Sequence, residues 1–173
     1  MLSDYIRTIY DRPKPGIAFK DITPLLQDAR AFQDCAQQFF ARYHGKNLTA
    51  IVGIESRGFI FGAMLAEMLW VGFIPIRKAG KLPAETEKID YALEYGTATI
   101  EIHKDALKAG DRVVLMDDLI ATGGSALAAC ELIERLGAEV VEVASVIDLK
   151  FLGGSTYLMS SGYEIFSLLE YEE

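Results

Sequence analysis

The segment with the strongest chemical character is Val113–Ser125, which reads VVLMDDLIATGGS. An apolar run leads into two adjacent aspartates, Asp117 and Asp118, and a loop of small residues with a Gly-Gly pair follows. Two like charges side by side disfavour each other unless they have a partner. A tight strand–helix turn with solvated aspartates explains either pair taken alone, since Asp and Gly are common turn residues. The pattern as a whole favours a binding site.

The loop after the aspartates has the features of a phosphate-binding turn. The side chains of Ala121, Thr122, Gly123, Gly124 and Ser125 are small, so an anion can approach the backbone N–H groups closely. The helix expected next would direct its unpaired N–H groups and its positive dipole end to the same place. The segment matches neither GxxxxGK[ST] nor GxGxxG. A monophosphate on the loop and vicinal hydroxyls on the aspartates, bound directly or through magnesium, describe a ribose 5-phosphate.

The composition narrows the class of protein. The chain has 173 residues, of which 51% are hydrophobic and 24% charged, as in a soluble globular protein of one domain. The net charge of −8 argues against broad nucleic-acid binding, although a locally basic pocket is compatible with it. The sequence shows no signal-peptide pattern and no apolar run of membrane-spanning length, so a cytoplasmic protein is expected. Cys35, Cys130, His44 and His103 fit no disulfide framework or metal-ligand spacing.

Strand-like and helix-like segments alternate along the chain. Helices are expected at Asp28–Tyr43, Phe59–Leu69 and Ser125–Leu136. Strands are expected at Thr49–Ile54, Val71–Ile76, Thr97–His103, Arg112–Met116, Glu139–Leu149 and Tyr163–Leu169. This alternation predicts an α/β fold with a parallel twisted sheet flanked by helices, in which ligands bind beyond the carboxyl ends of the strands. The polar segment Arg77–Tyr95, which contains Gly80 and Pro83, favours a mobile loop.

The segment VVLMDDLIATGGS resembles the phosphoribosyl-diphosphate signature of the type I phosphoribosyltransferases. Other segments resemble the adenine-specific branch of that family: KPGIAFKDITPLL (Lys14–Leu26), GIESRGFIFGAMLA (Gly53–Ala66), VGFIPIRKAGKLP (Val71–Pro83), LEYGTATIEIHKDAL (Leu93–Leu107) and the ending FSLLEYEE. The resemblance covers nearly the entire chain in the family's order. It implies one phosphoribosyltransferase domain over residues 1–173, with a small base-binding hood at residues 1–30 and a flexible lid at residues 77–95.

The resemblance implies that adenine and phosphoribosyl diphosphate are converted to AMP and pyrophosphate in a homodimer, with Mg²⁺ as the cofactor. Positive charge develops on the sugar and negative charge on the leaving group, so both need stabilisation. Asp117 and Asp118 would serve the sugar, and the loop Ala121–Ser125 the 5-phosphate. The family usually has Thr where this chain has Ser125, which retains the hydroxyl.

For pyrophosphate, the resemblance implies a second anion site at Glu55, Ser56 and Arg57. Backbone N–H groups and the Arg57 guanidinium are the available donors, and Arg57 counts with the catalytic residues. Related enzymes have a non-proline cis peptide in this loop, which would fall at Glu55–Ser56. On the residues alone, Arg57 could also be a solvated charge beside a turn.

The basic side chains Arg77, Lys78 and Lys81 form a dense cluster in this acidic chain. Charged loops are common, so the cluster alone decides nothing. The resemblance places it in a lid that closes over the diphosphate and excludes water, and in related enzymes Arg77 also acts across the dimer. Ala79 stands at a position where the family varies between a basic residue and Pro, so no cation is assumed there.

Ala18, Phe19 and Lys20 correspond to the family's adenine-binding segment, in which the aromatic ring stacks on the base and backbone groups read its amino edge. Without the resemblance, a core anchor for the N-terminal segment is the preferred interpretation of Phe19. Arg is more frequent than Lys at position 20, but backbone reading survives the change. Glu94 matches the catalytic carboxylate that exchanges a proton with the purine, and Tyr95 helps to position the lid.

Two other functions stay open at this point. One is a regulator that senses phosphoribosyl diphosphate and binds nucleic acid or a protein, and the other is a related enzyme acting on xanthine or a pyrimidine. The segments AFKD and LEYG favour the adenine reaction. The net charge of −8 argues against the nucleic-acid-binding regulator.

Overall fold

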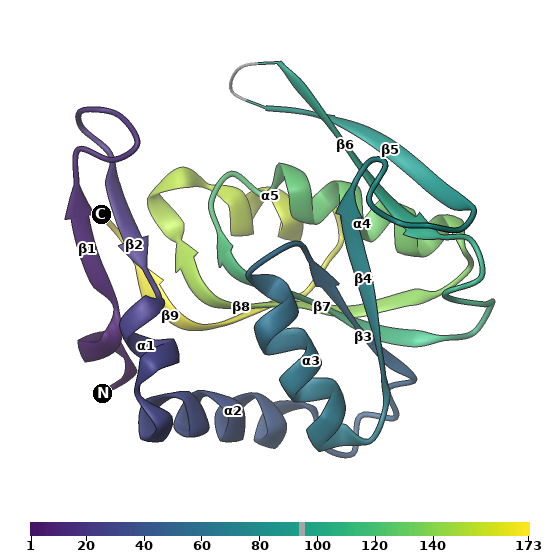
Figure 1. The fold of residues 1–173 in the computed structure, drawn as a ribbon, viewed down its shortest axis with the longest axis horizontal. Helices are drawn as coiled ribbons and strands as arrows, with labels where there is room; N and C mark the ends of the chain where they lie inside the picture. Colours follow the sequence, from purple (N-terminus) through teal and green to yellow (C-terminus); the bar gives the residue numbers. More distant parts are fainter. Residues whose placement is uncertain (94–95) are drawn as a thin grey trace. The chain divides into compact units, whose positions relative to one another are not determined.

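The computed structural model describes residues 1–93 and 96–173, and the chain forms two compact units, Met1–Arg42 and Tyr43–Glu173 (Figure 1). The elements that begin in the first unit are η1 (Leu2–Tyr5), β1 (Arg7–Tyr10), β2 (Ala18–Asp21), α1 (Thr23–Gln27) and α2 (Ala29–Tyr43). The strands β1 and β2 pair in antiparallel fashion. The hood expected over residues 1–30 falls within this unit, and its role stays a prediction.

Two aspartates organise the first unit. Asp21 accepts hydrogen bonds from the guanidinium of Arg7 and from the hydroxyl and N–H of Thr23, which joins β1, β2 and α1. Asp28 caps α2, because its Oδ1 accepts the N–H groups of Arg30 and Ala31 at 3.0 and 2.9 Å. The helix expected at Asp28–Tyr43 is therefore confirmed as α2. The four-residue strands β1 and β2 are too short for periodicity to reveal.

In the described residues of the second unit, a seven-stranded sheet has the order β5-β6-β4-β3-β7-β8-β9 (Figure 1). The strands are β3 (Ala50–Ile54), β4 (Gly72–Lys78), β5 (Thr86–Ala92), β6 (Thr97–His103), β7 (Arg112–Ile120), β8 (Glu139–Leu149) and β9 (Ile165–Tyr171). The neighbouring strands β4, β3, β7, β8 and β9 are parallel. The expected parallel sheet is confirmed, and β5 and β6 extend its edge as an antiparallel ribbon.

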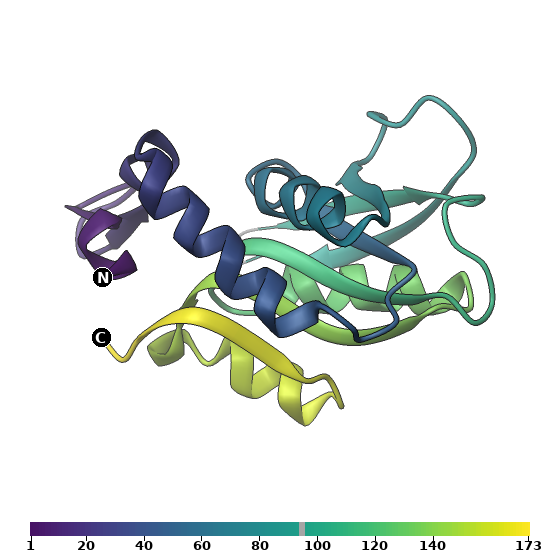
Figure 2. The same cartoon turned by 90° about the horizontal axis from the view of Figure 1, so that it is seen from below.

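Helices cover both faces of this sheet (Figure 2). α3 (Gly58–Leu69) packs on β3, β4 and β7, while α4 (Gly124–Arg135) and α5 (Gly154–Ser160) pack on the opposite face, with η2 (Lys150–Leu152) preceding α5. Val113–Met116 in β7 is fully buried, as a continuous apolar run in a doubly covered strand should be. No helix among the described residues has the length and apolar character to cross a membrane.

The structure corrects two expectations about element bounds. β7 continues to Ile120 through parallel pairing with β8, so Asp117 and Asp118 belong to the strand and do not follow it. The segment at residues 77–95, expected as a loop, contains β5. This strand looked like a loop because it is mostly polar and directs only Ile89 and Tyr91 toward the core. Glu94 and Tyr95 lie outside the described residues.

The start of α3 lies unusually close to β7. A Cβ atom on Gly58 would lie 2.7 Å from the Met116 carbonyl oxygen and 3.1 Å from Oδ1 of Asp117. Because the nearest atom belongs to the backbone of a central strand, it cannot move aside easily. Glycine at this position therefore lets the helix begin directly beside the paired aspartates.

We expect Gly58→Ala to lower the free energy of unfolding by about 2 kcal/mol, because overpacking against the β7 backbone outweighs the better helix propensity of alanine. Urea unfolding followed by circular dichroism measures this change. Gly72→Ala is the matched control, since a Cβ there meets nothing within 4 Å. Equal stability of the two variants would contradict the close packing of α3 on β7.

Candidate functional site

A cavity of about 390 Å³ opens at the carboxyl edge of the parallel strands. Its lining includes Glu55, Ser56 and Arg57 after β3, Lys78 at the end of β4, Asp117 and Asp118 in β7, and Ser125 in the first turn of α4. Residues separated by up to 70 positions in the sequence thus share one cavity. This is the place where open parallel sheets bind ligands.

The paired aspartates differ in environment. Asp118 is 5% exposed, and its Oδ2 accepts a hydrogen bond from Nε of Arg57 at 2.6 Å, which forms an ion pair. Oδ1 of Asp117 accepts the N–H of Asp118 at 2.8 Å. Burial of the Asp117 carboxyl group, followed by the nearby Asp118 charge, raises the pKa of Asp117 well above its ordinary value. Arg57 therefore supplies the counter-charge beside Asp118.

The predicted phosphate loop, Ala121–Ser125, leads from β7 into α4. Gly123 is the N-cap of α4 and has φ +83°, a conformation that favours glycine. The backbone N–H groups of the first helical turn have no partner within the helix, so they are available to an anion. The helix contains no acidic residue in its first turn. The arrangement suits a phosphate, as the sequence predicts.

A second glycine supports this loop from the α5 side. The Gly154 N–H donates to the Ala121 carbonyl oxygen at 3.1 Å, and a Cβ on Gly154 would lie 2.2 Å from that oxygen. A Cβ on Gly123 would in turn lie 2.8 Å from the Gly154 carbonyl oxygen. Sequence reasoning missed Gly154, for which the Gly-Gly pair at residues 153 and 154 was the available signal.

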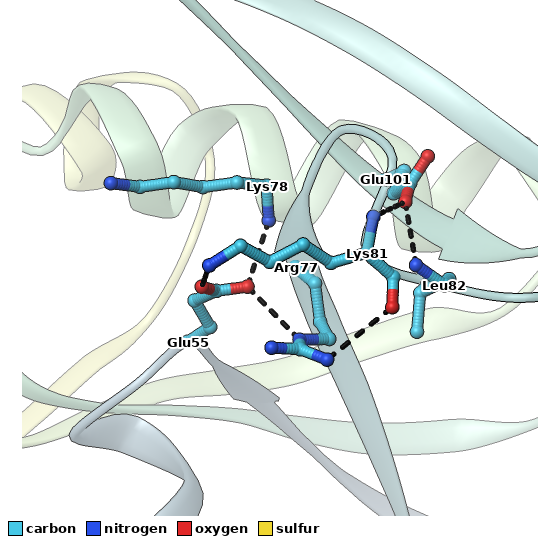
Figure 3. Close-up of polar contacts among 6 residues, drawn as sticks. All are labelled: Glu55, Arg77, Lys78, Lys81, Leu82 and Glu101. Atoms are coloured by element: carbon cyan, nitrogen blue, oxygen red, sulfur yellow. Dashed lines mark hydrogen bonds and ion pairs between the residues drawn. The ribbon is translucent and has the colours of Figure 1, made fainter.

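The predicted pyrophosphate residues also come together. The peptide bond Glu55–Ser56 is cis, as the resemblance implied. Nε of Arg77 and Nζ of Lys81 donate to the Glu55 carboxylate at 3.0 and 2.7 Å (Figure 3). The Lys78 side chain extends away from Glu55 in the same view, and Lys78 lines the cavity. Sequence reasoning did not foresee that Glu55 would hold two of the three cations.

The candidates for base recognition belong to the first unit. Ala18, Phe19 and Lys20 form the start of β2, and all three are partly buried. Nζ of Lys20 donates to the Thr8 hydroxyl at 3.2 Å, across the β1–β2 pair. Their role in binding adenine stays a prediction. The predicted catalytic Glu94 and its neighbour Tyr95 lie outside the described residues.

The donor set for a metal ion is limited. Within residues 1–93 and 96–173, no group of three or more His, Cys, Asp or Glu side chains could hold a metal ion. The cavity offers Asp117 and Asp118, and one Asp118 oxygen is already bonded to Arg57. Two carboxylates suit a Mg²⁺ ion that takes its other ligands from substrate phosphates and water, which is the usual arrangement for this ion.

Comparison with known proteins decides the family. The family model of the phosphoribosyl transferase domain matches residues 20–168. The adenine phosphoribosyltransferase of Roseiflexus sp. (strain RS-1) is 56% identical over 170 residues, which cover 98% of each chain. The chain belongs to the adenine phosphoribosyltransferase family. The resemblance found in the sequence is thereby confirmed.

Solved structures of this family agree in fold. The crystal structure of adenine phosphoribosyltransferase from Thermoanaerobacter pseudethanolicus has a TM-score of 0.93 and 48% identity, covering 99% of this chain and 100% of that one. The Trypanosoma brucei member in complex with AMP, pyrophosphate and ribose-5-phosphate has a TM-score of 0.89 and 29% identity, covering 98% of this chain and 78% of that one. Both similarities confirm the expected type I phosphoribosyltransferase fold.

We expect Gly123→Ala to weaken the binding of ribose 5-phosphate at least ~10-fold, which is about 1.4 kcal/mol. The added Cβ would be strained at φ +83° and would collide with Gly154 beneath the loop. Isothermal titration calorimetry measures the affinity. Gly110→Ala is the control, because Gly110 has φ +89° but open space around its Cβ position and lies outside the cavity lining. Equal affinities of the two variants for ribose 5-phosphate would contradict the assignment of this loop to phosphate binding.

Proposed function

We propose that this chain transfers the 5-phosphoribosyl group from phosphoribosyl diphosphate to adenine, giving AMP and pyrophosphate. The observation that carries the proposal is the shared cavity, in which the aspartate pair, the start of α4 and the turn Glu55–Arg57 meet. The chain that forms it belongs to the adenine phosphoribosyltransferase family. The ligands named for the Trypanosoma brucei relative, AMP, pyrophosphate and ribose-5-phosphate, are the groups that such a reaction handles.

In this proposal the sugar lies along the end of β7. The 5-phosphate binds the backbone N–H groups of the loop Ala121–Ser125, where the α4 dipole favours negative charge. The ribose hydroxyls donate to Asp117 and Asp118. As the bond between the anomeric carbon and the diphosphate breaks, the Asp118 carboxylate stabilises the positive charge that develops on the sugar.

The leaving group is assigned to the opposite end of the cavity. Backbone N–H groups of Ser56 and Arg57 and the ammonium group of Lys78 receive the negative charge that collects on pyrophosphate. The N–H of Glu55 donates to the Ile76 carbonyl oxygen at 2.9 Å, so it is not one of these donors. Arg57 lies between the two ends, because it is paired with Asp118 and adjoins the pyrophosphate turn.

Other parts of the proposal rest on the family resemblance. Ala18, Phe19 and Lys20 bind adenine, Glu94 exchanges a proton with the base, and Tyr95 positions the lid. Asp117 and Asp118, together with substrate phosphates and water, would hold a Mg²⁺ ion, which would neutralise phosphate charge. A homodimer is likewise part of what the resemblance implies.

The direct test is nucleotide formation from phosphoribosyl diphosphate and Mg²⁺ with adenine, hypoxanthine, guanine, xanthine and uracil in parallel. We expect AMP and pyrophosphate from adenine alone. Asp118→Asn should lower kcat at least ~100-fold, because it removes the charge opposite the developing cation. Asp105→Asn, an exposed position outside the cavity lining, should leave kcat unchanged.

Two outcomes would contradict the proposal. Turnover with a different base would retain the sugar and phosphate assignments and overturn the adenine assignment. Binding of phosphoribosyl diphosphate without turnover of any base would indicate a sensor of that metabolite.

A further inference from the structure

The side chain of Glu55 is the meeting point of the basic cluster (Figure 3). Oε2 accepts the Nε–H of Arg77 and the backbone N–H of Lys78, both at 3.0 Å, and Oε1 accepts from Nζ of Lys81 at 2.7 Å. The Glu55 side chain is 9% exposed. Burial alone would raise the pKa of Glu55, but the hydrogen bonds from Lys81, Lys78 and Arg77 outweigh it and lower the pKa. Glu55 is therefore a buried, ionised carboxylate with both oxygens occupied.

A second carboxylate, Glu101 in β6, holds the loop between β4 and β5 (residues 79–85). Its Oε1 accepts the backbone N–H groups of Lys81 and Leu82 at 3.0 and 2.9 Å, and Oε2 accepts the Thr86 hydroxyl at 3.1 Å. Nζ of Lys88 lies 3.4 Å from Oε2. The Glu101 side chain is 1% exposed. Burial opposes its ionisation, yet backbone and side-chain hydrogen bonds lower the pKa of Glu101 to about 2.

Lys81 is consequently held at three points. Its ammonium group is bound by Glu55, its N–H by Glu101, and its carbonyl oxygen accepts from Nη1 of Arg77 at 3.3 Å. Arg77 and Glu101 are themselves register partners in the β4–β6 pair. The loop carrying Lys81 is thus tied both to the turn after β3 and to the ribbon, with no ligand required for either bond.

The charges in this cluster do not cancel. Glu55 faces two cations, Arg77 and Lys81, which stay 35% and 48% exposed despite their ion pairs. Lys78 adds a third cation, whose side chain extends away from Glu55 (Figure 3). Within the described part of the chain, its ammonium group forms no ion pair. Three positive groups around one carboxylate leave an excess of positive charge beside the cavity, which attracts an anion.

We propose that Glu55 is a positioning residue that preorganises Arg77 and Lys81 for pyrophosphate, while Glu101 fixes the loop backbone that carries Lys81. The identity of the anion rests on the proposed function. Long basic side chains lose rotamer freedom when they bind a ligand, so holding them in advance strengthens binding. If Glu55 instead occupied the place where the anion binds, it would weaken binding. Removal of its charge should therefore weaken pyrophosphate binding in the first role and strengthen it in the second.

The test is the affinity of pyrophosphate for Glu55→Gln, measured by isothermal titration calorimetry in the presence of Mg²⁺. We expect binding ~10-fold weaker than in the unaltered chain, with the affinity for ribose 5-phosphate unchanged. Glu87→Gln is the matched control. Glu87 lies in the same ribbon, pairs with Arg135 of α4 at 3.3 Å and is outside the cavity lining. Unchanged or tighter pyrophosphate binding in Glu55→Gln would overturn the inference.

A double-mutant cycle separates positioning from general loss of structure. If Glu55 acts through Lys81, adding Glu55→Gln to Lys81→Met should weaken pyrophosphate binding by a smaller factor than it does alone. Independent, multiplicative losses would contradict the mechanism. Glu55→Asp, which retains the charge on a shorter side chain, should recover part of the affinity, and no recovery would count against the role of the carboxylate.

The inference and the proposed function can fail separately. If the unaltered chain binds pyrophosphate but forms no AMP from adenine, the proposed function falls and the Glu55 measurement still decides the inference. If it forms AMP and Glu55→Gln binds pyrophosphate normally, the inference falls alone.

Discussion

Two adjacent carboxylates within a buried central strand impose the constraint on which the rest of the site depends. Such a pair is unfavourable unless neighbouring groups stabilise it, and the structure meets this need unequally. Asp118 has the Arg57 guanidinium at 2.6 Å, whereas burial and its neighbour raise the pKa of Asp117. Because Arg57 directly precedes α3, this ion pair joins the start of that helix to β7. In the proposed function, the same contact connects the sugar and pyrophosphate ends of the cavity.

Close backbone approaches make this arrangement possible. Gly58 lets α3 begin against β7, and Gly123 and Gly154 let the phosphate loop rest on the start of α5. Each approach brings main-chain groups to the cavity edge that bulkier residues would hold apart. In the proposed function, anion recognition thus depends mainly on backbone donors, with charged side chains supplying the surrounding field. Glu55 and Glu101 hold part of these charges in place. Glu55 binds the ammonium group of Lys81, and Glu101 binds the backbone of the loop that carries Lys81.

The sequence was most informative where the signal was local. The apolar run in β7, the bounds of β8 and the helices α3 and α4 followed from periodicity. The segment with the paired aspartates and the Gly-Gly loop contributes Asp117, Asp118 and Ser125 to the cavity, and its role in binding sugar and phosphate stays a prediction. β5 was not predicted from the sequence, because a solvated ribbon strand is as polar as a loop. The Arg57–Asp118 pair and the Gly154 contact were not predictable, since they join segments more than 30 residues apart through tertiary packing.

The most direct test of this account is a crystal structure of the chain with ribose 5-phosphate, pyrophosphate and Mg²⁺. The account predicts the 5-phosphate on the N–H groups of residues 122–125, the sugar hydroxyls on Asp117 and Asp118, and pyrophosphate at the turn that contains Arg57. A sugar phosphate bound elsewhere, with the start of α4 free of ligand, would contradict the central claim that the carboxyl end of β7 organises the reaction site.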